Sequence, residues 1–223
     1  GGFDTADYSR ADEAVSVDLA SGQGLAGEAL GDTLIGIEKL VGSVHADSFS
    51  GSDGDDTFDG GFGDDQIAGG AGSDSYLFGF DSGEDTVTEL GSAADTDRVV
   101  MGSDIQPKDI SIVRESDDLL IELERDDGYL IDTLRVKDHF AGRETGIEEI
   151  VFKDGTVWDR DTIDQLQRTG RFNAQDDIFR LGVEDETALI ELADLTANDV
   201  AEGAENLTLV SVQNAINGTV QIL

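Results

Sequence analysis

Aspartates recur at nine-residue intervals through the middle of the chain. Asp47, Asp56, Asp65 and Asp74 are nine residues apart, and Asp85 follows eleven residues later. A carboxylate is a hard anionic oxygen ligand of the kind that Ca²⁺ prefers. The regular spacing therefore predicts a row of calcium ligands. The aspartates outside this register are expected to face solvent: Asp53, Asp55, Asp59 and Asp64.

Glycines precede these aspartates and provide the other ligand groups that calcium needs. Glycine permits positive φ angles, so a tight turn can direct several backbone carbonyl oxygens inward. Ca²⁺ takes six to eight oxygen ligands at about 2.3–2.6 Å, and two stacked turns can supply them where one cannot. The expected carbonyl ligands lie near Ser52, Gly54, Gly61, Gly63, Gly70, Gly72 and Gly83. The sequence thus predicts two or three calcium ions, each bound between two turns.

A short strand after each turn is expected to hold these ligands in place. The second residue after each aspartate is large and apolar, and as the inward member of a strand it would fill a narrow core. These residues are Phe49, Phe58, Ile67, Tyr76 and Val87. Nine residues make half a coil, so residues 18 apart return to the same side. The expected ion-binding pairs are Asp47 with Asp65, Asp56 with Asp74, and Asp65 with Asp85.

These repeats resemble the glycine- and aspartate-rich nonapeptides of RTX proteins. The units begin at Gly42, Gly51, Gly60 and Gly69, with glycine first, aspartate sixth and an apolar residue eighth. The resemblance extends over residues 42–91. It implies a right-handed parallel β-roll that folds on extracellular calcium. It also implies export by type I secretion machinery.

The composition excludes several classes of partner. The chain has 50 Asp and Glu residues against 14 Lys and Arg, for a net charge of −36, and no Lys or Arg occurs from Leu40 through Asp97. Such a field repels nucleic acids and anionic membrane surfaces. The chain has no cysteine for disulfides or thiolate sites, and no stretch approaches the ~18 apolar residues of a membrane span. We therefore expect no nucleic-acid partner and no membrane insertion, and cations remain the natural partner.

The segment before the repeats, residues 1–41, predicts degenerate coils of the same solenoid. Val15–Leu19 alternates polar and apolar residues, as a half-buried strand does, and Thr33–Leu40 also predicts a short strand. The glycine-rich residues 20–32 predict a loop between them.

The segment after the repeats, residues 92–165, predicts a small β-rich capping domain. Strand-like stretches alternate with turn residues there, and 161–167 predicts one or two helical turns. A linker at 166–175 and a partial β-sandwich at 176–223 are expected to follow. The whole chain is thus predicted to be all-β.

Both of these later segments resemble known modules. Residues 92–165 are similar to the haemolysin-type calcium-binding-related domain, and residues 176–223 resemble the start of a cadherin-like adhesin repeat. The first resemblance is carried by Asp97–Gly102, Asp118–Ile121 and Ile147–Trp158. The second is carried by Asp176–Phe179, Glu184–Leu189, Leu195–Asp199 and Asn217–Val220.

No enzyme motif is present, so no catalytic residue is assigned and an enzymatic role is not expected. The sequence lacks His-Glu-x-x-His, Gly-x-Ser-x-Gly and a phosphate-binding loop. The patterns predict a calcium-binding structural module of a secreted or cell-surface bacterial protein, as part of a large RTX adhesin. The alternative is the calcium-binding accessory region of a secreted RTX protease, lipase or epimerase with its catalytic domain outside this chain. A weaker hypothesis gives the capping domain a carbohydrate ligand, and neighbouring domains would then contact a host surface or glycan.

Overall fold

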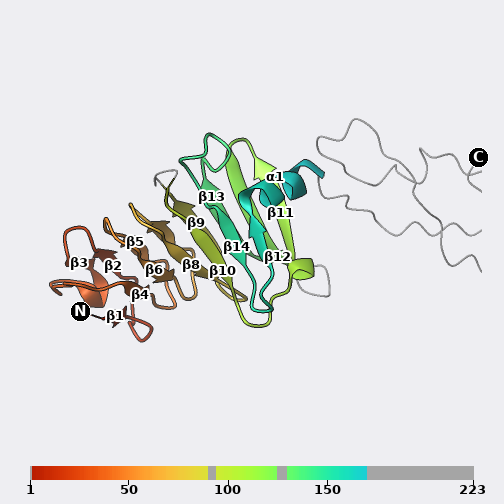
Figure 1. The fold of residues 1–223 in the computed structure, drawn as a ribbon. Coiled ribbons are helices and arrows are strands. Elements are labelled where there is room, and N and C mark those ends of the chain that lie inside the picture. The colour runs from red at the N-terminus through yellow and green to blue at the C-terminus, as the bar shows by residue number, and fades with distance from the viewer. Residues whose placement is uncertain (1, 90–93, 125–129, 170–223) are drawn as a thin grey trace, which may run out of the picture. The chain divides into compact units, whose positions relative to one another are not determined.

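The computed structural model describes residues 2–89, 94–124 and 130–169, and every structural statement below refers to them (Figure 1). Gly1–Gln167 forms one compact unit. It is built from two β-sheets, and the only α-helix in the described ranges is α1 (Arg160–Thr169). The all-β prediction is confirmed. The predicted linker begins too early at 166, because α1 continues through Thr169, and the predicted sandwich at 176–223 lies outside the described residues.

The first sheet contains seven strands. Their order across the sheet is β1 (Thr5–Asp7), β4 (Lys39–Val41), β6 (Thr57–Asp59), β8 (Ser75–Phe78), β10 (Arg98–Met101), β14 (Glu149–Val151) and β15 (Val157–Asp159). Every neighbouring pair is parallel except β14 and β15.

The second sheet contains eight strands. Their order is β11 (Ile110–Glu115), β12 (Asp118–Glu124), β13 (Leu130–Lys137), β9 (Glu84–Thr88), β7 (Gln66–Ala68), β5 (Ser48–Ser50), β2 (Ser16–Asp18) and β3 (Gln23–Ala26). The strands from β13 to β2 are parallel, and the outer pairs are antiparallel. Two single-turn 3₁₀ helices, η1 (Gly27–Ala29) and η2 (Pro107–Asp109), complete the elements.

The repeats form a parallel β-roll. From β4 to β10 the chain alternates between the two sheets, so each strand pairs with the strand one full coil away. In that register Phe49 lies beside Ile67, and Phe58 lies beside Tyr76. The nine-residue half-coil predicted from the sequence is therefore the unit of the fold.

The core of the roll is one side chain deep on each sheet. All five predicted core residues are buried, and Phe58 and Val87 have no exposed surface. The rings of Phe58 and Tyr76 stack with their centroids 5.7 Å apart. Because each half-coil contributes a single large apolar residue, the apolar area per residue is small. Burial of these side chains therefore contributes only part of the stability of the roll, and interactions in the turns must contribute the rest.

The segment after the repeats extends both sheets without a break. Strand β10 pairs in parallel with β8 and β14, and β13 pairs in parallel with β9. The meander β11-β12-β13 then adds the antiparallel edge of the second sheet. Leu119 and Ile121 of β12, and Ile150 of β14, are fully buried. This capping segment is the continuation of the roll rather than a separate core.

Two details predicted for the first 41 residues are wrong. The segment 20–32 contains strand β3, which pairs antiparallel with β2, so it is more than a loop. The predicted strand Thr33–Leu40 is ordered as a strand only from Lys39, within β4. Gly36 has a φ of 65°, and this left-handed residue interrupts the extended backbone that the apolar residues suggested.

Candidate calcium sites

The turns between strands are stacked backbone on backbone. Gly63 has a φ of 111°, and a Cβ there would lie 2.6 Å from the carbonyl carbon of His45 in the preceding coil. Gly72 has the same relation to Gly54, at 2.6 Å and with a φ of 109°. These positions accept only glycine, because a side chain would meet backbone atoms that cannot move aside. The close approach also brings the carbonyl oxygen of Gly54 against the turn of Gly72.

The predicted ligand aspartates are all buried. Their exposed fractions are 1% for Asp47, 3% for Asp56, 0% for Asp65, 0% for Asp74 and 5% for Asp85. Ionised carboxylates are rarely buried to this degree unless they are paired or bind a metal. The off-register aspartates behave differently: Asp53, Asp55 and Asp64 are exposed, and Asp59 is half-buried with the Lys39 ammonium 3.8 Å away.

Successive aspartates are joined by hydrogen bonds from one coil to the next. The backbone N–H of Asp47 donates to Oδ1 of Asp65 at 2.7 Å. The N–H of Asp56 donates to Oδ1 of Asp74 at 2.8 Å, and that of Asp65 donates to Oδ1 of Asp85 at 2.9 Å. The structure therefore brings together all three pairs that were expected to bind ions. We call these two rows of carboxylates, one along each sheet, the aspartate ladders.

The ladder aspartates are of two kinds, which differ in whether the second carboxylate oxygen, Oδ2, has a hydrogen-bond partner. In Asp56, Oδ2 accepts from the N–H and the hydroxyl of Ser52, at 2.7 and 2.9 Å. Ser43 binds Asp47 with the same two groups, but its N–H donates to Oδ2 at 2.5 Å and its hydroxyl to Oδ1 at 3.0 Å. The units of Asp65 and Asp74 have glycine where these serines stand. In the described part of the chain, Oδ2 of Asp65 and Oδ2 of Asp74 are buried without a hydrogen-bond partner.

Burial raises the pKa of the Asp65, Asp74 and Asp85 carboxyls. The pKa of Asp65 and of Asp74 rises to about 7, and that of Asp85 to about 8, because each carboxylate is removed from water. Neighbouring carboxylates raise these pKa values further, whereas the backbone N–H donors lower them. Since Leu40 through Asp97 contains no Lys or Arg, a bound cation or a proton has to compensate this charge. An orphaned carboxylate oxygen beside stacked carbonyl groups fits a hard divalent cation.

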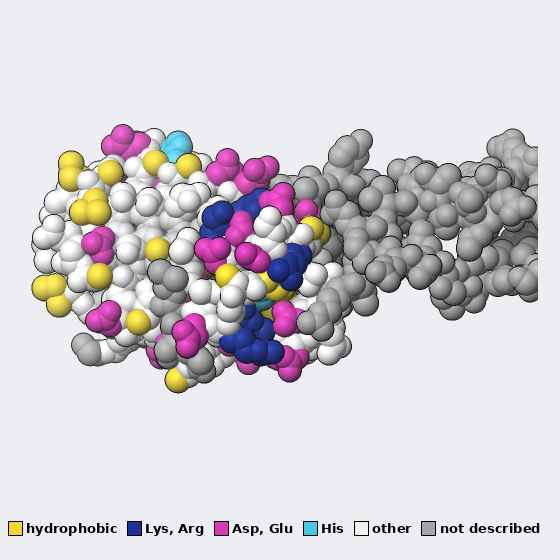
Figure 2. Space-filling model, turned by 90° about the horizontal axis from the view of Figure 1, so that it is seen from above, with side chains coloured by type: hydrophobic (Ala, Val, Ile, Leu, Met, Phe, Trp, Pro, Cys, Tyr) yellow, Lys and Arg dark blue, Asp and Glu magenta, His cyan; other side chains and the backbone are white. Residues whose placement is uncertain are grey.

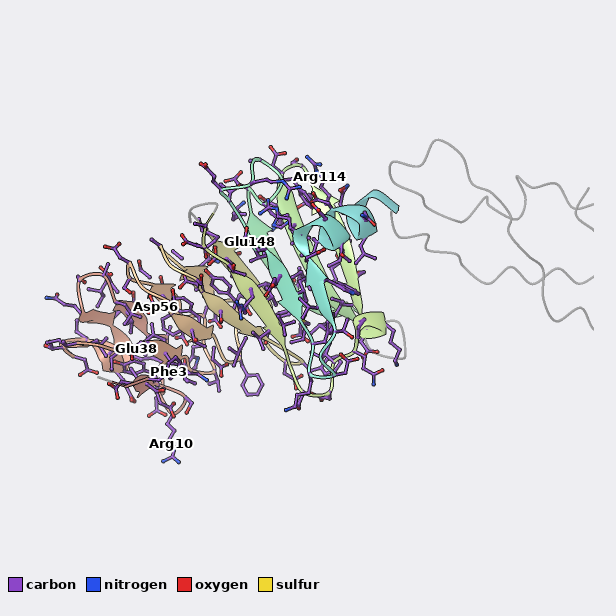
Figure 3. All side chains as sticks on the ribbon, in the orientation of Figure 1. Phe3, Arg10, Glu38, Asp56, Arg114 and Glu148 are labelled. Carbon is purple, nitrogen blue, oxygen red and sulfur yellow. The ribbon has the colours of Figure 1, made fainter. Side chains whose placement is uncertain are left out.

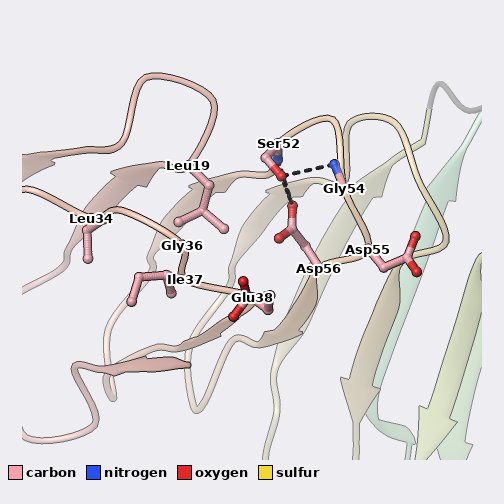
Figure 4. A pocket seen from close by; sticks show the side chains of 9 residues that line it. All are labelled: Leu19, Leu34, Gly36, Ile37, Glu38, Ser52, Gly54, Asp55 and Asp56. Atoms are coloured by element: carbon pink, nitrogen blue, oxygen red, sulfur yellow. Dashed lines mark hydrogen bonds between the residues drawn. The ribbon is translucent and has the colours of Figure 1, made fainter. Parts of the chain in front are cut away.

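A further acidic residue, Glu38, lies next to Asp56 and was not predicted from the sequence (Figure 4). It lines a hollow of about 180 Å³ together with Asp56, Ser52 and Gly54. The pKa of Asp56 is raised mainly by burial, and the negative charge of Glu38 raises it further. Glu38 is 18 residues before Asp56 and two residues before buried Leu40. That acid–x–apolar pattern is the signal that could have identified it.

The ladder along the first sheet continues beyond the predicted residues. The N–H of Asp74 donates to Oδ1 of Asp97 at 2.8 Å, and the N–H of Asp97 donates to Oε2 of Glu148 at 2.9 Å. The other oxygen of Glu148 lies 3.3 Å from the guanidinium of Arg160. Glu148 is in the segment that follows the roll, whereas Glu38 and Asp56 lie within the roll (Figure 3). The ladder thus ends at a cation supplied by the protein itself.

Among the described residues, only two Lys or Arg side chains, Arg10 and Lys39, precede the cap. In the face shown in Figure 2, Lys and Arg side chains gather toward the end of the described unit that carries the cap. Arg135 and Lys137 bind Asp118 there, at 2.9 and 3.1 Å. These pairs place both cations on a carboxylate of the cap itself.

The buried histidine of the cap, His139, has a packing role. Burial, and then the charge of Arg160, lowers its pKa to about 3, so the ring is neutral. Its Nδ1 accepts the N–H of Ile147 at 3.3 Å, and the ring packs edge-on against Phe140.

Comparison with known families agrees with this geometry. Residues 41–76 match the family described as RTX calcium-binding nonapeptide repeat (4 copies). Residues 118–162 match the haemolysin-type calcium binding protein related domain. No match was found among curated protein sequences. None of the described helices combines the length and the apolar character of a membrane span. Over the matched residues the chain is part of an RTX protein, in which calcium-binding repeats are followed by a haemolysin-type calcium-binding-related domain.

Proposed function

We propose that this chain is a structural module whose roll folds on extracellular Ca²⁺, with ions held between Asp47 and Asp65, Asp56 and Asp74, and Asp65 and Asp85. The carbonyl oxygens of the glycine turns, including those near Ser52 and Gly54, complete the coordination. The module works outside the cell, in a secreted or surface-attached protein.

The observation that carries this proposal is the pair of buried, unpartnered oxygens on Asp65 and Asp74. Both residues are fully buried, and Oδ1 of each already accepts a hydrogen bond from the backbone of the neighbouring coil. Leaving such a group without a partner costs about 1–3 kcal/mol, and more for a charged group. A divalent ion would bind both this oxygen and the carbonyl groups of the neighbouring turn.

Calcium concentration then decides whether the roll folds. Extracellular calcium modules bind with dissociation constants of roughly 10⁻⁴–10⁻³ M. An ion present at 100-fold above its dissociation constant stabilises the folded state by about 2.7 kcal/mol. Two or three linked ions would supply a large part of the 5–15 kcal/mol that is typical of a folded domain. A chain that stays unfolded at low cytosolic calcium is suited to passage through a type I secretion channel, the route typical of RTX proteins.

Circular dichroism during a calcium titration tests the proposal. The β content should be low in chelator and should rise cooperatively in millimolar calcium. Asp65→Asn should shift the midpoint to higher calcium, whereas Asp53→Asn, which removes the same charge from an exposed position, should leave it unchanged. Equal β content in chelator and in calcium would contradict the proposal.

For the whole protein we propose an adhesin, since residues 176–223 resemble the start of a cadherin-like repeat and such repeats build stalks. The other candidate is the accessory region of a secreted RTX enzyme. The flanking sequence separates them: further sandwich repeats support the adhesin, and a catalytic domain supports the enzyme. Binding of the cap to a glycan array would add a carbohydrate ligand to either.

A further inference from the structure

Three buried carboxylates meet where the repeats join the cap. They belong to Asp74, just before β8, Glu89, just after β9, and Asp97, just before β10. Their exposed fractions are 0%, 1% and 2%. One ligand oxygen from each lies within 4.8 Å of the others. Glu89 comes from the opposite sheet, so this cluster differs from the aspartate pairs within one ladder.

A fourth oxygen belongs to Tyr76. Its hydroxyl donates a hydrogen bond to Oε2 of Glu89, and the side chain is 1% exposed. Tyr76 stands at the apolar eighth place of its unit, where the two preceding units have Phe58 and Ile67. Among these three side chains, only tyrosine brings a polar atom into the interior of the roll.

Gly69 leaves the space on which these oxygens converge. A Cβ placed on Gly69 would lie within 2.6 Å of Tyr76 Oη, Glu89 Oε2 and Asp74 Oδ2. The last of these atoms is the buried oxygen that has no hydrogen-bond partner among the described residues. An orphaned carboxylate oxygen therefore points into the same small space as two other oxygens.

The composition of this cluster indicates the chemistry of its ligand. It presents up to three negative charges and only oxygen donors, a set that favours a hard divalent cation. The neighbouring cation Arg98 has its guanidinium 3.8 Å from Glu149 and directed to the surface of the sheet, with 40% of its side chain exposed. The charge of three buried carboxylates is otherwise strongly unfavourable.

We propose that Asp74, Glu89 and Asp97, with the hydroxyl of Tyr76, form a calcium site at the junction between the roll and the cap. The proposal deepens the proposed function, because the site shares Asp74 with one of the repeat sites. It ties β8 and β10 of one sheet to β9 of the other, so the bound ion fixes the last coil of the repeats to the first strand of the cap.

Counting bound ions on the whole chain tests the site. In equilibrium dialysis against calcium chloride, Glu89→Gln should bind one ion fewer than the wild type. Glu84→Gln is the matched control, because it removes the same charge from an exposed position on β9 and should lose no ion. If Glu89→Gln binds as many ions as the wild type, with unchanged affinity, the junction site does not exist.

A terbium experiment reads the site through Tyr76 and separates it from the repeat sites. Tb³⁺ replaces Ca²⁺ at oxygen sites and emits when a nearby excited aromatic ring transfers energy to it. Tyr76→Phe and Glu89→Gln should both remove the same component of this emission, whereas Asp65→Asn should retain it. Emission that is unchanged in Tyr76→Phe and Glu89→Gln overturns the junction site alone. Failure of the wild type to bind either ion overturns the repeat sites as well.

Discussion

Replacing Asp65 with Asn should change stability in opposite directions in the absence and presence of calcium. The Asp65 carboxylate is fully buried, accepts the N–H of Asp47 at 2.7 Å through Oδ1, and has no partner for Oδ2. Asn keeps the shape and the Oδ1 acceptor but removes the charge. In chelator at about pH 8, near or above the raised pKa of about 7, the variant should be more stable than the wild type. The reason is that an uncompensated buried charge is gone.

In calcium the same substitution should be strongly destabilising. Asp65 belongs to two of the proposed sites, one with Asp47 and one with Asp85. At 100-fold above its dissociation constant each ion contributes about 2.7 kcal/mol, so the loss of both amounts to about 5 kcal/mol. Because the wild-type roll is expected to be mostly unfolded in chelator, the residual β content by circular dichroism measures the first effect there. Urea unfolding in calcium measures the second, with the exposed Asp53→Asn as control in both. A loss of stability in calcium no larger than that of Asp53→Asn would refute the assignment of Asp65 as a shared ligand.

Three further perturbations test the turns, the core and the protonation of the ladders. Gly63→Ala should lower the free energy of unfolding in calcium by about 2 kcal/mol or more, because it combines a left-handed φ with a backbone clash at 2.6 Å. Gly31→Ala, at a φ of 91° with open space around it, measures the cost of the left-handed φ alone in the same urea assay. Phe58→Ala should cost about 3–5 kcal/mol because the ring is fully buried, and Phe62→Ala, 51% exposed, less than about 0.5, both read from urea midpoints. The stability of the calcium-free protein should fall as the pH rises from about 4 to 8, since the ladder carboxyls bind protons more tightly when folded, with pKa values raised to about 7 or 8 against a usual 3.8. For the same reason calcium affinity should rise over the upper part of that range; titrations at about pH 6 and 8 measure it, and equal affinities would contradict the burial of these groups.

The repeats were predictable from the sequence because local chemistry and the fold impose the same nine-residue period. Glycines set the turns, one apolar residue sets each strand, and the aspartate follows at a fixed place. The pairing of Asp47 with Asp65 follows from counting alone, and the hydrogen bond between them confirms that they are neighbours.

The acidic residues near the ladders that were missed lie where insertions or substitutions break that period. Asp97 continues the ladder 23 residues after Asp74 rather than 18, so counting by nines does not reach it. At position 38 a glutamate stands where the repeat pattern has an aspartate. Glu89 and Glu148 lie outside the nine-residue register. Glu89 follows β9 of the second sheet, and Glu148 precedes β14, which meets β10 only through the pairing of strands far apart in the sequence. Strand β3 was missed because its residues, Gln23–Ala26, have weak strand propensity and are extended only through pairing with β2.

The two ends of the ladder on the first sheet show how the fold handles buried negative charge. Within the repeats the sequence from Leu40 through Asp97 has no Lys or Arg, so compensation has to come from bound cations or protons and depends on their concentration. Beyond Asp97 the next acceptor is Glu148, and Arg160 binds it while also donating to the carbonyl oxygens of Gly142 and Thr145, each at 2.7 Å. The guanidinium is permanently charged and nearly buried, with 9% of its side chain exposed. The cap therefore has an internal cation where the roll needs external ones. This difference implies that calcium removal should unfold the repeats more readily than the cap.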